Sequence, residues 1–278
     1  MTGRIFWVIA LVASGHQVAA QTELTAAARS GTARYQDRAQ AIADGYRAVG
    51  PDFPGMGEHW VNTGLLLAGT LDPAQPPVLE YVTIGGHPTL VGVAYAALVN
   101  DSAVPTGLPV PASAWHTHAG TVDEESFVLS HAGVHRHHDP GRGPRVAVVH
   151  AWIWLDNPDG LFATDNWAVP CARLGFAVPA QLSADAGRAL ALAAGGTAYF
   201  AMLIRIVGAP DSAEHVRLRD VLHRAAVDIA RHVGHGTGAT PLPADAVPWL
   251  EAAWQRTWAT LLETASPPVR ERFAVLNR

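Results

Sequence analysis

Apolar positions in the C-terminal third of the chain recur at three- and four-residue steps, which is the period of a helix facing a core. Three segments show this pattern: 183–207, which is almost wholly apolar, 212–234, and a segment opened by Pro248. Asp211 and Glu214 have the spacing of a capping box ahead of the second segment. Residues 32–49 carry a similar stripe and predict a leading helix.

The middle of the chain has the pattern of strands. Residues 78–99 read as a hairpin around Gly85-Gly86-His87-Pro88, and residues 145–154 as a further strand. Residues 112–118 predict a short strand, and residues 119–144 are irregular. These patterns predict an α+β fold with an N-terminal helix, an antiparallel sheet core that carries the histidines and a C-terminal helical segment.

The N-terminus has the three-part pattern of a secretory signal peptide. Arg4 is followed by an apolar run from Ile5 to Ala13, and Val18 and Ala20 are small residues suited to cleavage after Ala20. The run is too short to span the ~30 Å hydrocarbon core of a bilayer. We therefore expect a periplasmic or secreted protein. The predicted organisation is a signal peptide (1–20), an α+β histidine-site domain (21–180) and a helical segment packed on it (181–278).

Composition narrows the functional classes. The net charge is −5 and no basic run is present, which argues against nucleic acid as a partner. All 19 basic residues are arginine, so chemistry that needs a lysine Schiff base is excluded. Half of the chain (49%) is apolar, enough for a sizeable core, and residues 189–204 are too short for a membrane span and predict a buried helix. Cys171 has no partner for an internal disulfide and is interpreted as a buried, inert thiol.

Seven of the fourteen histidines fall between residues 116 and 150. In a strand, alternate side chains share a face, so His116 and His118 should point the same way. His150 lies among valines and tryptophans, on the face predicted for Val148, Trp152 and Trp154, where burying an unpaired imidazole is costly. These three histidines are the candidate metal ligands. The alternative is a neutral core histidine bonded to a backbone carbonyl.

His59 is the fourth candidate ligand, or a substrate contact. It lies in a glycine-rich segment, on a loop or at a strand start, with Glu58 before it. Each candidate has a tryptophan close in sequence (Trp60, Trp115 or Trp152), and such rings would exclude water from the site. The alternative is that these tryptophans fill a β-sheet core.

Other polar clusters give weaker indications. Residues 131–138 hold four histidines in a Gly/Pro-rich loop, where a solvated loop or a weak metal collector is expected. Asp123, Glu124 and Glu125 offer an oxygen ligand or a base, although a solvated acidic loop explains them equally well. A solvent-facing role is expected for a further group of helix histidines: 215, 223, 232 and 235.

Signatures of known hydrolases, H-E-x-x-H and G-x-S-x-G, are absent. Five segments (44–46, 55–62, 90–95, 115–118 and 150–162) together resemble an uncharacterised family of exported bacterial proteins that shares GMGxHWVN, WHxH and HxWxWxxNPxGxF motifs. The resemblance covers roughly residues 35–175 and implies no particular activity. Its members often carry Val-Glu-Tyr where this chain has Val93-Ala94-Tyr95, which implies that a carboxylate of the site is missing here.

The favoured function is an exported protein with one mononuclear site built by His116, His118 and His150, with His59 nearby. One divalent transition metal ion (Zn, Cu or Fe) is the expected cofactor, and a metal-dependent hydrolase or oxidoreductase is the enzyme class that such a site suits. The alternative is a metal-free periplasmic binding protein with a Trp/His-lined groove for a small molecule or glycan. Storage or delivery of metal through the 131–138 loop is a third interpretation. No nucleic-acid partner and no membrane span after signal removal are expected.

Metal analysis of protein produced in the periplasm separates these interpretations. A mononuclear site predicts about one equivalent of metal, lost on replacement of His116 and His118 together, because two of its imidazole ligands are removed. A collecting loop predicts several weakly held equivalents that survive the double change, and a metal-free protein predicts none.

Overall fold

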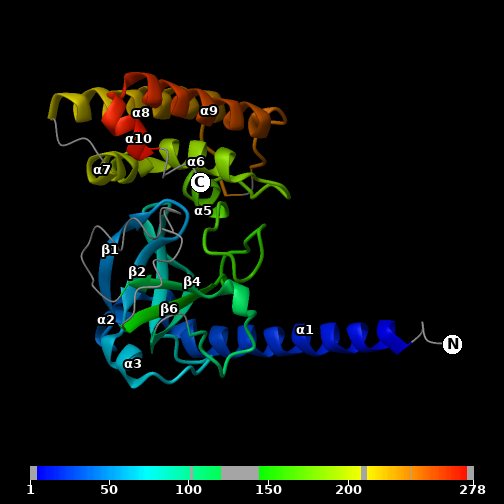
Figure 1. Ribbon diagram of the computed structural model, residues 1–278. Coiled ribbons are helices and arrows are strands. Elements are labelled where there is room, and N and C mark those ends of the chain that lie inside the picture. Colours follow the sequence, from blue (N-terminus) through cyan, green and yellow to red (C-terminus); the bar gives the residue numbers. More distant parts are fainter. Residues whose placement is uncertain (1–4, 101–102, 120–143, 208–211, 239, 274–278) are drawn as a thin grey trace.

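The computed structural model describes residues 5–100, 103–119, 144–207, 212–238 and 240–273. Figure 1 shows a curled sheet with a long N-terminal helix on one side and a stack of helices on the other. The predicted α+β class is therefore confirmed, with an N-terminal helix, an antiparallel sheet and C-terminal helices.

The sheet has six strands in the order β1-β2-β3-β4-β6-β5, and every neighbouring pair is antiparallel. The strands are β1 (Arg47–Phe53), β2 (Gly57–Val61), β3 (Val78–Ile84), β4 (His87–Asn100), β5 (His116–Ala119) and β6 (Pro144–Ala151). The predicted hairpin at 78–99 is confirmed as β3 and β4, with Gly85 and Gly86 at its turn. The short strand β5 pairs only with β6 among the described strands.

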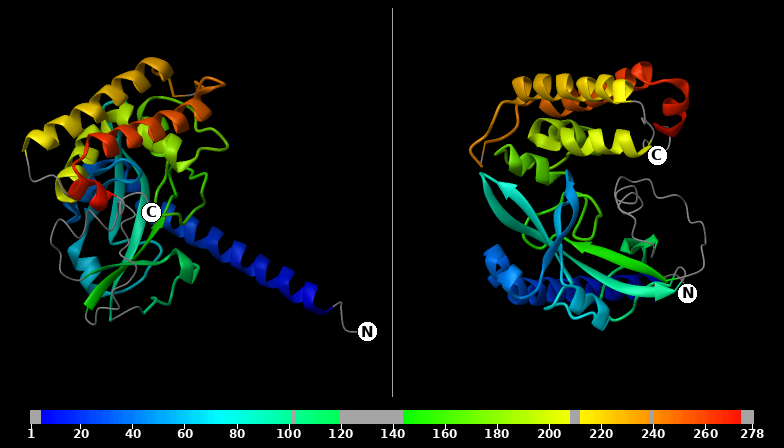
Figure 2. Two further views of the ribbon diagram at one scale, coloured as in Figure 1. Left: turned by 45° about the horizontal axis from the view of Figure 1, so that its top comes forward. Right: turned by 90° about the vertical axis from the view of Figure 1, so that its left-hand side faces the viewer.

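Helices on the N-terminal side cover one face of the sheet. They are α1 (Ile5–Thr32), η1 (Ala33–Gln36), α2 (Arg38–Ala43) and α3 (Thr63–Ala68), and a further short turn is η2 (Ala112–Ala114). Leu24 and Ala28 of α1 are buried against the sheet, whereas the helix begins well away from it (Figures 1 and 2). Tyr81 of β3 donates a hydrogen bond to the Tyr35 carbonyl (2.6 Å), which ties this helical layer to the sheet. Cleavage after Ala20 stays a prediction.

The C-terminal helices form a second layer with its own core. They are α5 (Ala168–Arg173), α6 (Ala184–Ala191), the π-helical η3 (Leu192–Gly196), α7 (Thr197–Val207), α8 (Ser212–Val233), α9 (Ala246–Thr264) and α10 (Pro267–Phe273). Figure 2 shows this layer across the sheet from α1. Cys171 is fully buried in this core, as predicted, and burial raises the pKa of its thiol to about 12, which disfavours the reactive thiolate.

Two predicted helices end or bend earlier than the sequence suggested. The helix expected at 32–49 stops at Ala43, because Gly45 adopts a left-handed φ of 96° and β1 starts at Arg47. The helix at 183–207 bends at η3, where Gly195 has a φ of 97°. By length and composition the segment Ala184–Arg205 would suit a membrane span, but more than half of its most apolar window is buried, as the predicted core helix requires.

The capping-box prediction for Asp211 and Glu214 stays a prediction, and Glu214 has a further contact outside its own helix. Its carboxylate accepts hydrogen bonds from the backbone N–H (2.6 Å) and the hydroxyl (3.1 Å) of Ser266, at the start of α10. Asp211 lies outside the described residues. Glu214 therefore fastens α10 to α8.

The two faces of the sheet carry different side chains. The face toward α1 is apolar and includes Leu79, Tyr95 and Val149. The opposite face carries the histidines, beside a small apolar group that includes Ala94 and Val148. Because side chains alternate along a strand, this division follows directly from the register of the strands.

Candidate metal centre

A row of polar side chains crosses the second face of the sheet. In the register, His59 of β2 lies opposite Glu80 of β3, and Glu80 lies opposite Gly92 of β4. Two residues further along β4, Ala94 lies opposite His150 of β6. The sheet thus brings residues that are 21 and 70 positions apart in sequence onto one patch.

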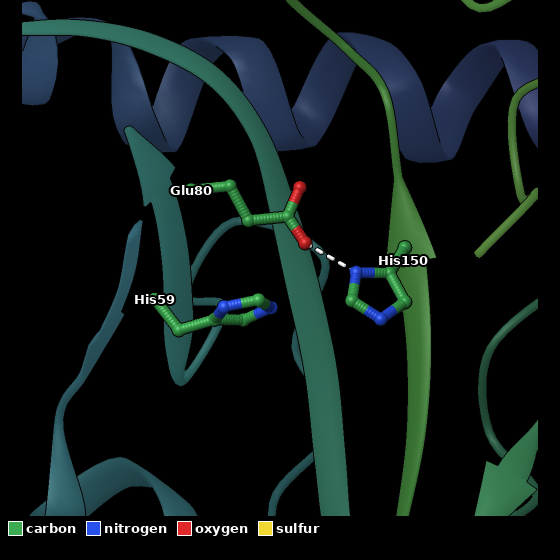
Figure 3. Close-up of side chains that lie close together, drawn as sticks. All are labelled: His59, Glu80 and His150. Carbon is green, nitrogen blue, oxygen red and sulfur yellow. Dashed lines mark hydrogen bonds and ion pairs between the residues drawn. The ribbon is translucent and has the colours of Figure 1, made fainter. Parts of the chain in front are cut away.

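The three polar residues of this row form a compact buried group. Each of His59, Glu80 and His150 offers one ligand atom, and these atoms lie within 4.8 Å of one another. Figure 3 shows the two imidazoles facing one another from β2 and β6, with the carboxylate reaching toward His150. Their exposed fractions are 4%, 0% and 1%. Two imidazoles and a carboxylate are donors that suit a transition metal, so this group is able to hold an ion.

His116 and His118 extend the group along the neighbouring strand. On β5 they lie opposite Val148 and Val146, so they share the face of His150. The ring centres of His116 and His150 are 5.3 Å apart, and those of His116 and His118 are 4.9 Å apart. The ring centre of His59 lies 5.7 Å from that of His150. The four histidines that the sequence singles out therefore lie near one another, but the compact group of ligand atoms includes only His59 and His150 of them, together with Glu80.

A buried hydrogen bond joins the group. Nδ1 of His150 meets Oε1 of Glu80, and in a neutral imidazole that donates from Nδ1 the lone pair lies on Nε2. The second carboxylate oxygen, Oε2, is buried and has no hydrogen-bond partner among the described residues. It lies over Gly92, where a Cβ atom would come within 2.2 Å of it. Gly92 therefore makes the space that the carboxylate occupies.

Burial shifts the pKa values of two members of the group, His59 and Glu80. It lowers the pKa of His59 well below 6.5, with smaller contributions from His150 and His118. It raises the pKa of Glu80, which the neighbouring His150 opposes. A neutral imidazole is the form that binds a metal, so the His59 environment favours a ligand.

Glu80 is the residue that sequence reasoning missed. The resemblance to the exported family implies that a carboxylate is missing at Ala94 of β4, and Glu80 supplies a different carboxylate from the neighbouring strand β3. The available signal was an acidic residue between Leu79 and Tyr81 in a strand that is otherwise apolar. An unpaired carboxylate in such a run is costly to bury, which points to a partner.

Fewer tryptophans lie beside the histidines than the sequence predicted. Trp60 and Trp115 pack with the cluster on the α1 side, away from the histidines. Trp154 was also placed on the histidine face, but β6 ends at Ala151 and the Trp154 indole donates to the Thr32 hydroxyl (3.2 Å). Only Trp152 among these stacks on a histidine, with ring centres 6.4 Å from His150.

The remaining candidates lie elsewhere. The 131–138 histidine loop and the acids Asp123, Glu124 and Glu125 are outside the described residues. His87 is exposed and begins β4. Of the helix histidines, His232 stacks on Trp249 with ring centres 3.7 Å apart, which is a packing role.

Comparison with protein-family models, with curated proteins and with solved structures finds no significant match to this chain. The site is therefore interpreted from its own geometry.

The lowered pKa of His59 has a consequence for stability. In the unfolded chain His59 takes up a proton near pH 6.5, whereas in the folded protein it stays neutral at this pH. The free energy of unfolding is therefore unaffected by His59 above this pH and decreases as the pH drops below it. One such proton contributes up to about 1.4 kcal/mol per pH unit. In urea unfolding of chelator-treated protein between pH 7.5 and 5, His59→Leu should show a shallower decline than wild type. The exposed His87→Leu should keep the wild-type decline, and equal slopes for all three proteins would contradict the assignment.

The packing of Glu80 over Gly92 is testable in the same way. Gly92→Ala should destabilise the protein by about 1–3 kcal/mol, because the added methyl overlaps the carboxylate. Glu80→Ala removes the overlapping group, so the cost of Gly92→Ala should shrink in that background. A double-mutant cycle by urea unfolding measures this coupling. Additive effects would show that the glycine serves another purpose.

Proposed function

We propose that this protein binds one transition metal ion in a mononuclear centre on the histidine-bearing face of its sheet. The observation that carries the proposal is the buried group of His59, Glu80 and His150, whose ligand atoms lie within 4.8 Å of one another. Residues from separate strands reach this arrangement through the register of the sheet. A metal ion would compensate the cost of burying these polar groups together.

The spacing of the rings supports His116 and His118 as further ligands. Two imidazoles that share one ion at N–metal distances of ~2.0–2.1 Å have ring centres roughly 5 Å apart. The three ring separations among these histidines are 4.9, 5.3 and 5.7 Å. We therefore propose His59, His116, His118 and His150 as the imidazole donors from which the centre is built.

Glu80 has a second role in the proposal. Metal-ligating histidines commonly donate their other ring N–H to a carboxylate, which fixes the tautomer and makes the ligand more basic. The bond between His150 Nδ1 and Glu80 Oε1 has this form and directs Nε2 of His150 toward the ion. The carboxylate also brings a buried negative charge next to a cation. Glu80 is thus a positioning residue for His150.

Such a donor set suits Zn, Cu, Fe or Ni. A bound ion would supply Lewis acidity, or a metal-bound water with a lowered pKa, which are the properties used by metal-dependent hydrolases and oxidoreductases. We place the protein in the periplasm or outside the cell because of the signal-peptide pattern in residues 1–20.

Metal content of site variants tests the proposal. Protein exported to the periplasm should carry about one equivalent by elemental analysis, and His59→Gln and His150→Gln should each lose it. Glu80→Gln retains an oxygen that accepts from His150, so it should bind with an affinity reduced about 10–100-fold in a chelator competition. His87→Gln, on the exposed hairpin turn, is the matched control and should bind as wild type does.

Two results would contradict the proposal. Full metal content in His59→Gln and His150→Gln would place the ion elsewhere, and several weak equivalents would favour a collecting loop. A wild-type protein that folds and takes up no ion would favour the metal-free binding protein.

A further inference from the structure

A cavity lies where the helical layer meets the end of the sheet. It has a volume of about 100 Å³. Its walls come from the turn after β1, from Asp165 and Trp167 in the connection to α5, and from helices α6, α7, α8 and α9. The junction of two layers is a common place for a small-molecule site.

Aromatic rings make up much of the wall. Six of the lining residues are aromatic: Phe53, Trp167, Tyr199, Phe200, Trp254 and Trp258. The rings contact one another in series, with centre separations of 5.6 Å for Phe53 and Tyr199, 5.3 Å for Phe200 and Trp254, and 6.4 Å for Trp254 and Trp258. An aromatic wall favours the flat face of another ring.

One acid and one base also line the cavity. The Asp165 backbone is held by the Asn157 amide, which donates to its carbonyl (2.8 Å). The Arg188 guanidinium lies over the Trp167 ring at 5.6 Å and pairs with Asp185 (3.0 Å). Burial raises the pKa of Asp165 to about 6, which His150 and then Arg188 oppose, so the carboxyl is mostly ionised at neutral pH. The cavity thus offers a hydrogen-bond acceptor and a donor of opposite charge.

We propose that this cavity binds a small neutral phenol or aryl alcohol, with its ring among the aromatic walls and its hydroxyl at Asp165 and Arg188. A hydroxyl both donates and accepts, so it satisfies the carboxylate and the guanidinium together. The guanidinium of Arg188 would repel an ammonium ligand, and the carboxylate of Asp165 would repel a carboxylate ligand. The cavity therefore disfavours both charged classes of ligand. An apolar cavity of ~150 Å³ holds benzene, so a cavity of about 100 Å³ has no room for two rings.

The cavity adjoins the proposed metal centre without being part of it. The Phe53 ring is 5.2 Å from that of His59 on one side and 5.6 Å from that of Tyr199 on the other. This inference goes beyond the proposed function and does not require an ion. Binding measured on chelator-treated protein therefore tests it separately from the metal centre.

Ligand-observed fluorine NMR with four single-ring probes tests the proposal on the metal-free full chain. The probes are 4-fluorophenol, 4-fluorotoluene, 4-fluorobenzoate and 4-fluorobenzylammonium. We expect 4-fluorophenol to bind at least about 10-fold more tightly than the others, since a hydrogen bond to a charged group contributes about 1.5–3 kcal/mol. Asp165→Leu should reduce its affinity to that of 4-fluorotoluene, and Asp165→Asn, which keeps an acceptor, should lose less.

Enlarging the cavity gives an independent test. Leu203→Ala truncates a lining residue and should allow 6-fluoro-2-naphthol, a two-ring phenol, to bind. Leu190→Ala makes the same truncation in the helical core, away from the lining, and is the matched control. Equal binding of 4-fluorotoluene and 4-fluorophenol, tightest binding of a charged probe, or no response specific to Leu203→Ala would each overturn the proposal.

Discussion

The bond between His150 and Glu80 is the constraint on which the site depends. Both side chains are almost completely buried, at 1% and 0% exposure, where an unpartnered charge is very costly. Their strands are not neighbours, because β4 lies between β3 and β6. The pair can meet only because Gly92, the β4 residue opposite Glu80, has no side chain. The absence of a side chain at Gly92 thus leaves room for the Glu80 carboxylate to reach His150 across β4.

The rest of the arrangement follows from the sheet. Antiparallel register places His59 beside Glu80 and brings His116 close to His150, so five polar residues share one face (Figure 3 shows three of them). The opposite face is apolar and is covered by α1, which leaves the second face for chemistry. The buried polar group and the apolar packing against α1 therefore lie on opposite sides of one sheet. The helical layer adds a separate core and closes the aromatic cavity against the sheet's end.

Strand and helix periodicity was enough to predict the hairpin, β6 and the α+β class, because each depends on local patterns. Glu80 was missed because its role in the site depends on the hydrogen bond to His150, which is 70 residues away in sequence. The predicted helix at 32–49 failed for a local reason, the left-handed Gly45, which the apolar stripe conceals. Trp154 was misplaced since alternation holds only while a strand continues, and β6 ends at Ala151.

The position of β5 has a consequence for exchange of an ion. This four-residue strand is at the edge of the sheet and, within the described part of the chain, pairs with β6 alone. Short edge segments detach at a far lower free energy than interior strands. His116 and His118 would then move away with β5, while His59 and His150 stay in place on β2 and β6. The rate at which β5 detaches would therefore limit the release of a bound ion. In turn, an ion bound by histidines of β5 and of the interior strands would stabilise β5 against detachment.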